Sequence, residues 1–274
     1  MNEARQKPWW QSFYDDTPFE IYMARTDHNE LAQSLAFLRG QLHIQPGAVI
    51  FDQCCGLGGM SIPLAEQGFR MIGADLCHKY IVMARAAANA SVEAGTLDKS
   101  VTTDFFVGDA FEYVPATTCD AAFNWYTSFG YAREDEQNVL MIENAFRAVK
   151  SGGYYALDFL NMPMILGAFK EEMTTVLHSE TGDIIQTRRC KLINEPGEDG
   201  SATRLMMSQH WTWTMPDGKV IVQDSTLRAY MPEDLVRLFQ EVGFVDITLF
   251  GSCENGGQPR TDKSGRCIVV GRKP

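Results

Sequence analysis

Short apolar runs alternate with helical patterns along the first 160 residues of the chain. Five runs, each bounded by turn residues, suit buried parallel strands: 48–51, 69–75, 105–109, 119–125 and 154–160. Helical patterns occupy the stretches between and before them: 31–40, 61–67, 78–94 and 135–149. Strands that alternate with helices predict βαβ units, and therefore an α/β fold with a doubly wound, mostly parallel sheet and helices on both faces.

The pattern changes at Thr174. From there to Tyr230, strand-like runs flank turn signals at residues 181–183 and 216–218, which predicts an antiparallel β meander inserted after the fifth strand. A helix at 232–243, begun by proline and acids and ended by glycine, then leads back to the sheet. Two last strands, 245–250 and 267–271, would make the sheet seven-stranded.

These patterns divide the chain into four predicted parts. They are an N-terminal helical lid (1–45), a ligand-binding core (46–173), an inserted antiparallel cap (174–230), and a C-terminal helix with the last two strands of the core (231–274).

Charge and hydropathy narrow the range of partners. The chain has 24 Lys and Arg against 35 Asp and Glu, a net charge of −11, whereas nucleic-acid binders gain affinity from clustered basic residues. No apolar run approaches the roughly 18 residues that a membrane helix needs. The N-terminus lacks the apolar core of a signal peptide. We therefore expect a cytoplasmic protein, with a homodimer left open, that acts on a small molecule and neither on nucleic acid nor at a membrane.

The seven cysteines show no zinc-site spacing and no C-x-x-C pair. An odd number of dispersed cysteines is typical of free thiols in a reducing compartment. We expect neither a metal site nor a disulfide framework.

The first predicted strand ends in Asp52 and runs through small residues into Gly56 and Gly58. Glycine permits a positive φ and close approach of a ligand to the backbone, and ligands of open α/β sheets bind beyond the carboxyl ends of the strands. The turn lacks the G-x-G-x-x-G of a dinucleotide fold and the Lys-Ser/Thr of a P-loop, so the ligand should lack a diphosphate. A tight connection without a ligand is the alternative interpretation.

Two further acids follow the next two strands. Asp75 ends the second, where a carboxylate can accept both hydroxyls of a ribose. Asp109 ends the third, where it can accept from an adenine amino group while the backbone N–H of Ala110 donates to the ring. Each acid alone would be explained as a helix cap, but acids at the ends of three successive strands indicate a nucleoside site.

This order of strand, acid, glycine turn, acid and Gly-Asp-Ala resembles the class I methyltransferases that use S-adenosylmethionine. The resemblance covers about 48–160 and, by element order, the last helix and strands. It implies the same fold and S-adenosylmethionine as cofactor, held in five ways. The methionine part would face Gly56 and Gly58, and Asp52 would orient either the turn or, through water, the ammonium group. The ribose would face Asp75 with Leu76 beside it, and the adenine would face Asp109 and Ala110. A further contact would come from Asn124.

The fourth strand runs into a segment similar to the Thr/Ser-Ser-Phe-Gly-Tyr stretch of small-molecule members of this family. It departs from the Asn/Asp-Pro-Pro-Tyr/Phe motif of nucleobase and glutamine methylases. Aromatic faces attract a sulfonium or an ammonium ion. The candidates for the acceptor site, with a place in the ordinary core as the alternative, are Trp125, Tyr126, Phe129 and Tyr131, the last also a candidate catalytic residue.

Two other segments supply candidates. The aromatic N-terminus resembles the lid of such enzymes, with Tyr14, Tyr22 and Arg25 as candidates for holding the methionine carboxylate of the cofactor or the substrate. A surface helix docked by its aromatic side chains is the alternative. In the meander, Trp211 and Trp213 share one strand face as substrate contacts. His210 points the other way as a candidate general base, with a structural role as the alternative for each.

The resemblance implies methyl transfer to a nitrogen, hydroxyl or carboxylate of a small metabolite, with the meander expected to form the acceptor pocket. Two alternatives stay open. The fold could cyclise or cleave the side chain of S-adenosylmethionine and release methylthioadenosine, or it could bind the cofactor without catalysis.

Overall fold

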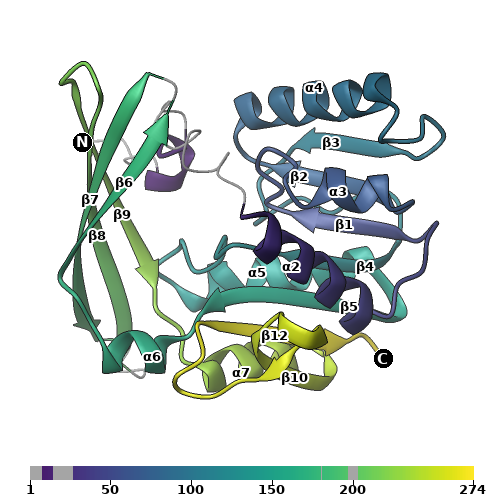
Figure 1. Cartoon of the computed structure of the whole chain (residues 1–274). Coiled ribbons are helices and arrows are strands. Elements are labelled where there is room, and N and C mark those ends of the chain that lie inside the picture. The colour runs from purple at the N-terminus through teal and green to yellow at the C-terminus, as the bar shows by residue number, and fades with distance from the viewer. Residues whose placement is uncertain (1–7, 15–26, 180, 197–202) are drawn as a thin grey trace, which may run out of the picture.

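The computed structural model describes residues 8–14, 27–179, 181–196 and 203–274. The central sheet has the strand order β11-β10-β12-β5-β4-β1-β2-β3 (Figure 1). Its strands are β1 (Val49–Gln53), β2 (Arg70–Asp75), β3 (Thr103–Val107), β4 (Cys119–Asn124), β5 (Val149–Leu160), β10 (Val245–Ser252), β11 (Gln258–Pro259) and β12 (Arg266–Arg272).

The five strands β1 to β5 pair in parallel, whereas β12 runs antiparallel to β5 and to β10. The predicted doubly wound, mostly parallel sheet is therefore confirmed. All seven predicted strands are present, and the two-residue strand β11 adds an edge that the sequence pattern did not show, because two residues carry no period.

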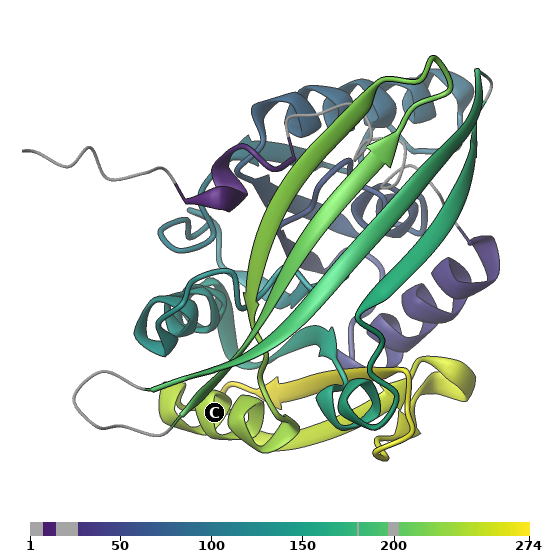
Figure 2. The same cartoon turned by 90° about the vertical axis from the view of Figure 1, so that its left-hand side faces the viewer.

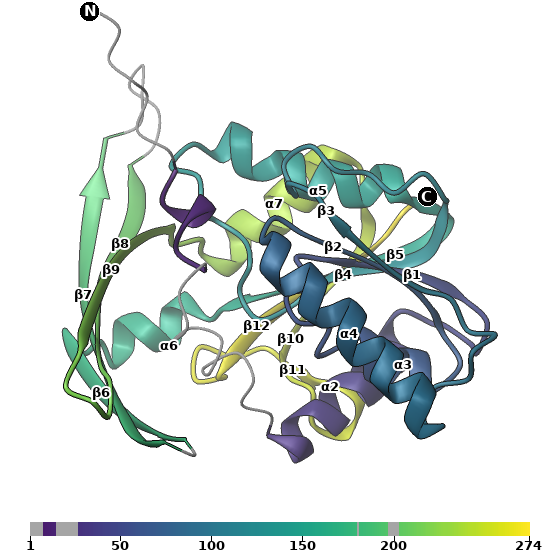
Figure 3. The same ribbon diagram turned by 90° about the horizontal axis from the view of Figure 1, so that it is seen from above.

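Helices cover both faces of the sheet. One face holds α2 (His28–Gln41), α3 (Ser61–Glu66) and α4 (His78–Ala94), and the other holds α5 (Asp135–Ala148) and α7 (Pro232–Val242). Successive strand residues point to opposite faces. Ile50 thus packs in the cluster beneath the first group, and Phe51 in the cluster beneath the second. Seen from above, the two layers of helices enclose the sheet (Figure 3).

The predicted meander forms a second sheet of four antiparallel strands, in the order β6-β7-β8-β9. Their bounds are β6 (Glu172–Ser179), β7 (Gly182–Glu195), β8 (Arg204–Thr214) and β9 (Val220–Arg228), preceded by a short helix, α6 (Met162–Gly167). Figure 2 shows this sheet face-on, in front of the rest of the molecule. Its inner face packs on the 3-10 helix η1 (Trp9–Gln11) and on Phe13.

Within the described ranges, no helix is both long enough and apolar enough to cross a membrane.

Candidate functional site

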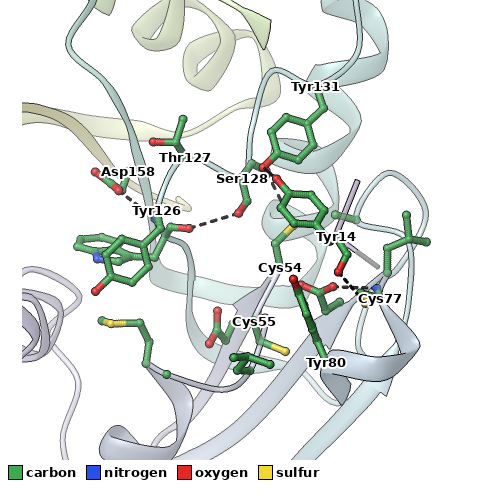
Figure 4. A pocket seen from close by; sticks show the side chains of 18 of the residues that line it. Tyr14, Cys54, Cys55, Cys77, Tyr80, Tyr126, Thr127, Ser128, Tyr131 and Asp158 are labelled. Carbon is green, nitrogen blue, oxygen red and sulfur yellow. Dashed lines mark hydrogen bonds between the residues drawn. The ribbon is translucent and has the colours of Figure 1, made fainter. Parts of the chain in front are cut away.

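A cavity of about 600 Å³ opens at the carboxyl ends of the parallel strands, where an open α/β sheet is expected to bind its ligand. Figure 4 shows that it has two sides, with Tyr14 and Tyr80 on one and Tyr126 and Asp158 on the other. Its charged lining residues in the described part of the chain are six acids and one base: Asp27, Glu30, Asp52, Asp75, Asp109, Asp158 and Arg266.

Asp75 joins the first two strand ends. Its Oδ2 accepts the backbone N–H of Gly56 at 2.9 Å, and its Oδ1 accepts that of Cys77 at 2.9 Å. Burial raises the pKa of Asp75, and the two backbone hydrogen bonds oppose the rise. Asp75 and the following Leu76 line the cavity, and their contact with a ribose stays a prediction. Gly56 shapes the turn by donating to Asp75, although it is not itself among the lining residues.

Gly58 has a structural role in the turn, and its contact with the methionine part of the cofactor stays a prediction. Its φ is +79°, and a β-carbon there would lie 3.1 Å from the Phe105 ring and 3.2 Å from Ile62. Because these side chains belong to the core, a larger residue would disturb the packing of the turn before it reached a ligand. Glycine is required here by backbone conformation and by close packing, both of which act on the fold.

Gly58→Ala should therefore lower the free energy of unfolding by about 1–3 kcal/mol, the scale of a strained left-handed residue. Chemical denaturation measures the change. Gly59→Ala is the matched control, since its added β-carbon would meet no atom within 4 Å. Equal stability of the two variants would contradict the packing role of Gly58.

Asp52 is almost completely buried at the end of β1 and lines the cavity. Its Oδ2 accepts the Ser61 hydroxyl at 2.6 Å. Burial raises the pKa of Asp52 from 3.8 to about 8; the Ser61 hydrogen bond opposes the rise and the charge of Asp75 adds to it. A cation in the cavity would favour the ionised form, which fits the predicted contact with an ammonium group.

The raised pKa of Asp52 makes stability depend on pH. Between about pH 4 and pH 8 the unfolded chain loses a proton that folded Asp52 keeps, so rising pH should destabilise the fold. Asp52→Asn removes this cost and can still accept from Ser61. We expect the variant's gain in melting temperature over the parent to grow from pH 5 to pH 8, while its affinity for S-adenosylmethionine falls. A constant difference across this range would contradict the assignment.

The third strand end completes the first side of the cavity. Asp109, Ala110 and Phe111 line it. The Oδ1 of Asp109 accepts the backbone N–H of Phe111 at 3.0 Å, which fixes the carboxylate at the start of the turn. The three acids Asp52, Asp75 and Asp109 therefore share one cavity, as the sequence predicted.

Two tyrosines close this side. The hydroxyls of Tyr14 and Tyr131 point toward one another and hydrogen-bond at 2.5 Å (Figure 4). Both residues line the cavity, and burial raises the pKa of each phenol, so both stay protonated at neutral pH. Tyr22 and Arg25, the other predicted lid contacts, lie outside the described residues.

Three cavity residues other than glycine have a positive φ: Cys54 (65°), Tyr126 (60°) and Thr127 (62°). Such conformations cost on the order of 1–3 kcal/mol and cluster at functional sites. The left-handed backbone of Tyr126 and Thr127 directs the Tyr126 ring, which is 49% exposed, to the second side of the cavity. No sequence pattern reveals it, because backbone dihedrals at non-glycine residues depend on the surrounding fold.

A charged network that the sequence analysis missed lies beside Tyr126. The Arg266 guanidinium donates twice to the buried Asp158 and, at 3.0 Å, to Glu30. Asp158 Oδ2 also accepts the backbone N–H of Tyr126 at 2.9 Å. The rings of Trp125 and Tyr126 lie 5.1 and 5.5 Å from the Arg266 guanidinium carbon. Asp158 could have been found as another acid near a strand end, but Arg266 and Glu30 meet it only through the tertiary fold.

The structure does not bring every candidate to the cavity wall. Asn124 is fully buried behind it, where it donates to Gln53 and to the Ser128 carbonyl. Phe129 is buried against Phe159 and Tyr230 in the core.

The meander candidates also lie elsewhere. Trp211 and Trp213 stack on each other and pack against Phe13. They therefore support the N-terminal segment that contains η1 and Phe13, and they do not line the cavity. His210 lies on the opposite face of β8, paired with Asp224 at 2.8 Å. No residue of the antiparallel sheet is among the lining residues, so, for the described chain, the expected acceptor pocket in the meander is not observed.

Comparison with known proteins gives the family. Residues 50–153 match the model of a methyltransferase domain. An S-adenosyl-L-methionine-dependent Diels-Alderase of Talaromyces variabilis is 28% identical over 120 residues, which cover 44% of this chain and 39% of that protein. The matches span 39–56% of the length of the curated relatives.

Solved structures share the fold over nearly their whole length. The CcbJ methyltransferase of Streptomyces caelestis has a TM-score of 0.73 at 14% identity, covering 96% of this chain and 98% of that one. The sugar N-methyltransferase KedS8 of a Streptoalloteichus species has a TM-score of 0.67 at 20% identity, covering 94% and 93%. With the acids of β1, β2 and β3 around one cavity, residues 50–153 form a methyltransferase domain of the class I, S-adenosylmethionine-dependent family.

Proposed function

We propose that this protein transfers the methyl group of S-adenosylmethionine to a nitrogen atom of a small-molecule amine. The observation that carries the proposal is the division of one cavity into two sides. One is built from the predicted cofactor residues, and the other from Trp125, Tyr126 and the Arg266 network.

The residues of the first side fit the cofactor. Its three carboxylates, Asp52, Asp75 and Asp109, suit a ligand that bears a sulfonium and an ammonium group, and the volume of the whole cavity, about 600 Å³, suits a nucleoside with a second molecule. Asp52 would hold the ammonium group, Asp75 the ribose hydroxyls, and Asp109 with Ala110 the adenine. When bound, the cofactor supplies a methyl group activated by positively charged sulfur.

The residues of the chain then need to align and shield the reactants. In-line displacement depends chiefly on holding donor and acceptor at a reactive distance. The covering tyrosines Tyr14 and Tyr131 exclude water from the first side. Positive charge moves toward the acceptor nitrogen as the bond forms, so carboxylates on the second side stabilise the transition state.

Nitrogen as acceptor atom is supported by charge and by similarity. The second side contains three carboxylates and one guanidinium, an environment that favours a cation. The similar structure of a sugar N-methyltransferase points the same way. The similarity to an S-adenosyl-L-methionine-dependent Diels-Alderase supports a second candidate function, a cycloaddition that depends on the cofactor.

The test is incubation of the protein with S-adenosylmethionine and pools of small amines, followed by mass spectrometry. We expect S-adenosylhomocysteine together with an amine heavier by one methylene unit. Methylthioadenosine would instead indicate cleavage or cyclisation of the side chain. Unchanged S-adenosylmethionine with a rearranged substrate would indicate pericyclic chemistry, and neither change would indicate a binding module.

A further inference from the structure

Arg266, the single base among the described residues that line the cavity, is not available to a substrate. Every guanidinium nitrogen of Arg266 donates to a carboxylate, two to Asp158 and one to Glu30. Its face is shared with the rings of Trp125 and Tyr126. A carboxylate substrate would find no free cation among the described lining residues, and it would meet three acids on this side.

The carboxylates of Glu30 and Asp27, in contrast, line the cavity and are open to a bound cation. Within the described chain, Glu30 uses only Oε1 for Arg266, and its side chain is 53% exposed. Asp27 uses only Oδ1, which accepts two backbone N–H groups at the start of α2. The half-exposed ring of Tyr126 lines the same cavity as Asp27 and Glu30, and an aromatic face attracts an ammonium ion.

A second, independent feature is the indole of Trp125. It lines the cavity and is 3% exposed, and its Nε1–H has no hydrogen-bond partner among the described residues. A buried donor without a partner is unfavourable, and an acceptor oxygen on a bound molecule would satisfy it. The site therefore offers one place for a cation and one for a neighbouring oxygen.

We infer that the acceptor is an amino alcohol, bound as an ammonium ion by Glu30, Asp27 and the Tyr126 ring, with its hydroxyl oxygen accepting from Trp125. This inference rests on the proposed function and names its substrate class. Glu30 is the specificity-determining residue, because its carboxylate lines the cavity, remains open to solvent and is held there by Arg266.

The chemistry balances with the groups present. The bound ammonium first loses a proton to the Glu30 carboxylate, which passes it to solvent. The free nitrogen lone pair then forms a bond to the methyl carbon as the carbon–sulfur bond breaks, and the electron pair of that bond goes to sulfur. The product is a methylated ammonium ion and a neutral thioether.

The experiment is calorimetric titration of the protein saturated with S-adenosylhomocysteine, with four probes of similar size. These are trans-2-aminocyclohexanol, cyclohexylamine, trans-1,2-cyclohexanediol and cyclohexanecarboxylate. We expect the amino alcohol to bind best and the carboxylate worst. Glu30→Gln should weaken both amines about three- to tenfold, the scale of a half-exposed charge interaction, and leave the diol and S-adenosylhomocysteine unchanged.

Two variants sharpen the result. Trp125→Phe should remove the preference for the amino alcohol over cyclohexylamine. Asp224→Asn is the control, because it removes an acid on the outer face of the antiparallel sheet. The inference is overturned if the amines bind no better than the diol, if Glu30→Gln acts no more strongly than Asp224→Asn, or if Trp125→Phe keeps the preference. Turnover of hydroxyl or carboxylate acceptors alone, with S-adenosylhomocysteine formed, would overturn it and leave methyl transfer intact.

Discussion

Asp75→Ala should weaken the binding of S-adenosylmethionine by about 1.5–3 kcal/mol, or roughly 10- to 150-fold in Kd. Its carboxylate faces the cavity and also fastens two backbone segments, through the N–H groups of Gly56 and Cys77. The variant would lose both the predicted ribose contacts and the hydrogen bonds that fix the glycine turn.

Calorimetry with S-adenosylmethionine measures this loss, and two further variants separate its causes. Asp75→Asn keeps one carbonyl oxygen for the turn, so it should fall between the alanine variant and the parent. Asp109→Ala should cost less than Asp75→Ala, because the backbone N–H of Ala110 remains available. Parent-like affinity in Asp75→Ala would reduce Asp75 to a structural acid at a strand end.

Arg266→Ala should lower the free energy of unfolding by about 3 kcal/mol, the scale of leaving one partner of a buried ion pair unpaired. Asp158 has a side chain only 3% exposed, and Arg266 one that is 20% exposed. Without the guanidinium, a buried carboxylate would keep only the N–H of Tyr126. Arg266 would no longer hold Asp158 in place, so the strained Tyr126–Thr127 turn would be anchored less firmly and the KM for the acceptor should rise.

Urea unfolding and acceptor kinetics measure the two effects. Arg272→Ala is the matched control on the same strand, since its pair with Asp246 is exposed and worth only about 0–1 kcal/mol. Arg266→Met combined with Asp158→Asn removes both charges and keeps an acceptor for Tyr126, so it should recover part of the stability. A loss no larger for Arg266→Ala than for Arg272→Ala would show that the network does not hold the turn.

The sequence by itself determined the first side of the cavity, which we propose to hold the methyl donor. Local patterns encode the strands, and parallel strands align their carboxyl ends at one edge. Acids that follow successive strands, such as Asp52, Asp75 and Asp109, must therefore meet. The antiparallel sheet could also be predicted from the sequence, because turn signals and alternating apolar and polar residues are local features.

Only the tertiary structure decided the second side of the cavity, which we propose to hold the acceptor. Arg266 is 108 positions from Asp158 and 236 positions from Glu30 in the sequence, although it hydrogen-bonds to both. No local pattern of residues connects positions so far apart. His210 showed the limit of reasoning from one strand, since alternation places it opposite Trp211 but cannot say which face meets the cavity. Packing on the N-terminal segment settled that choice, because the large apolar rings of Trp211 and Trp213 are buried against Phe13, whereas the polar pair of His210 and Asp224 stays at the surface.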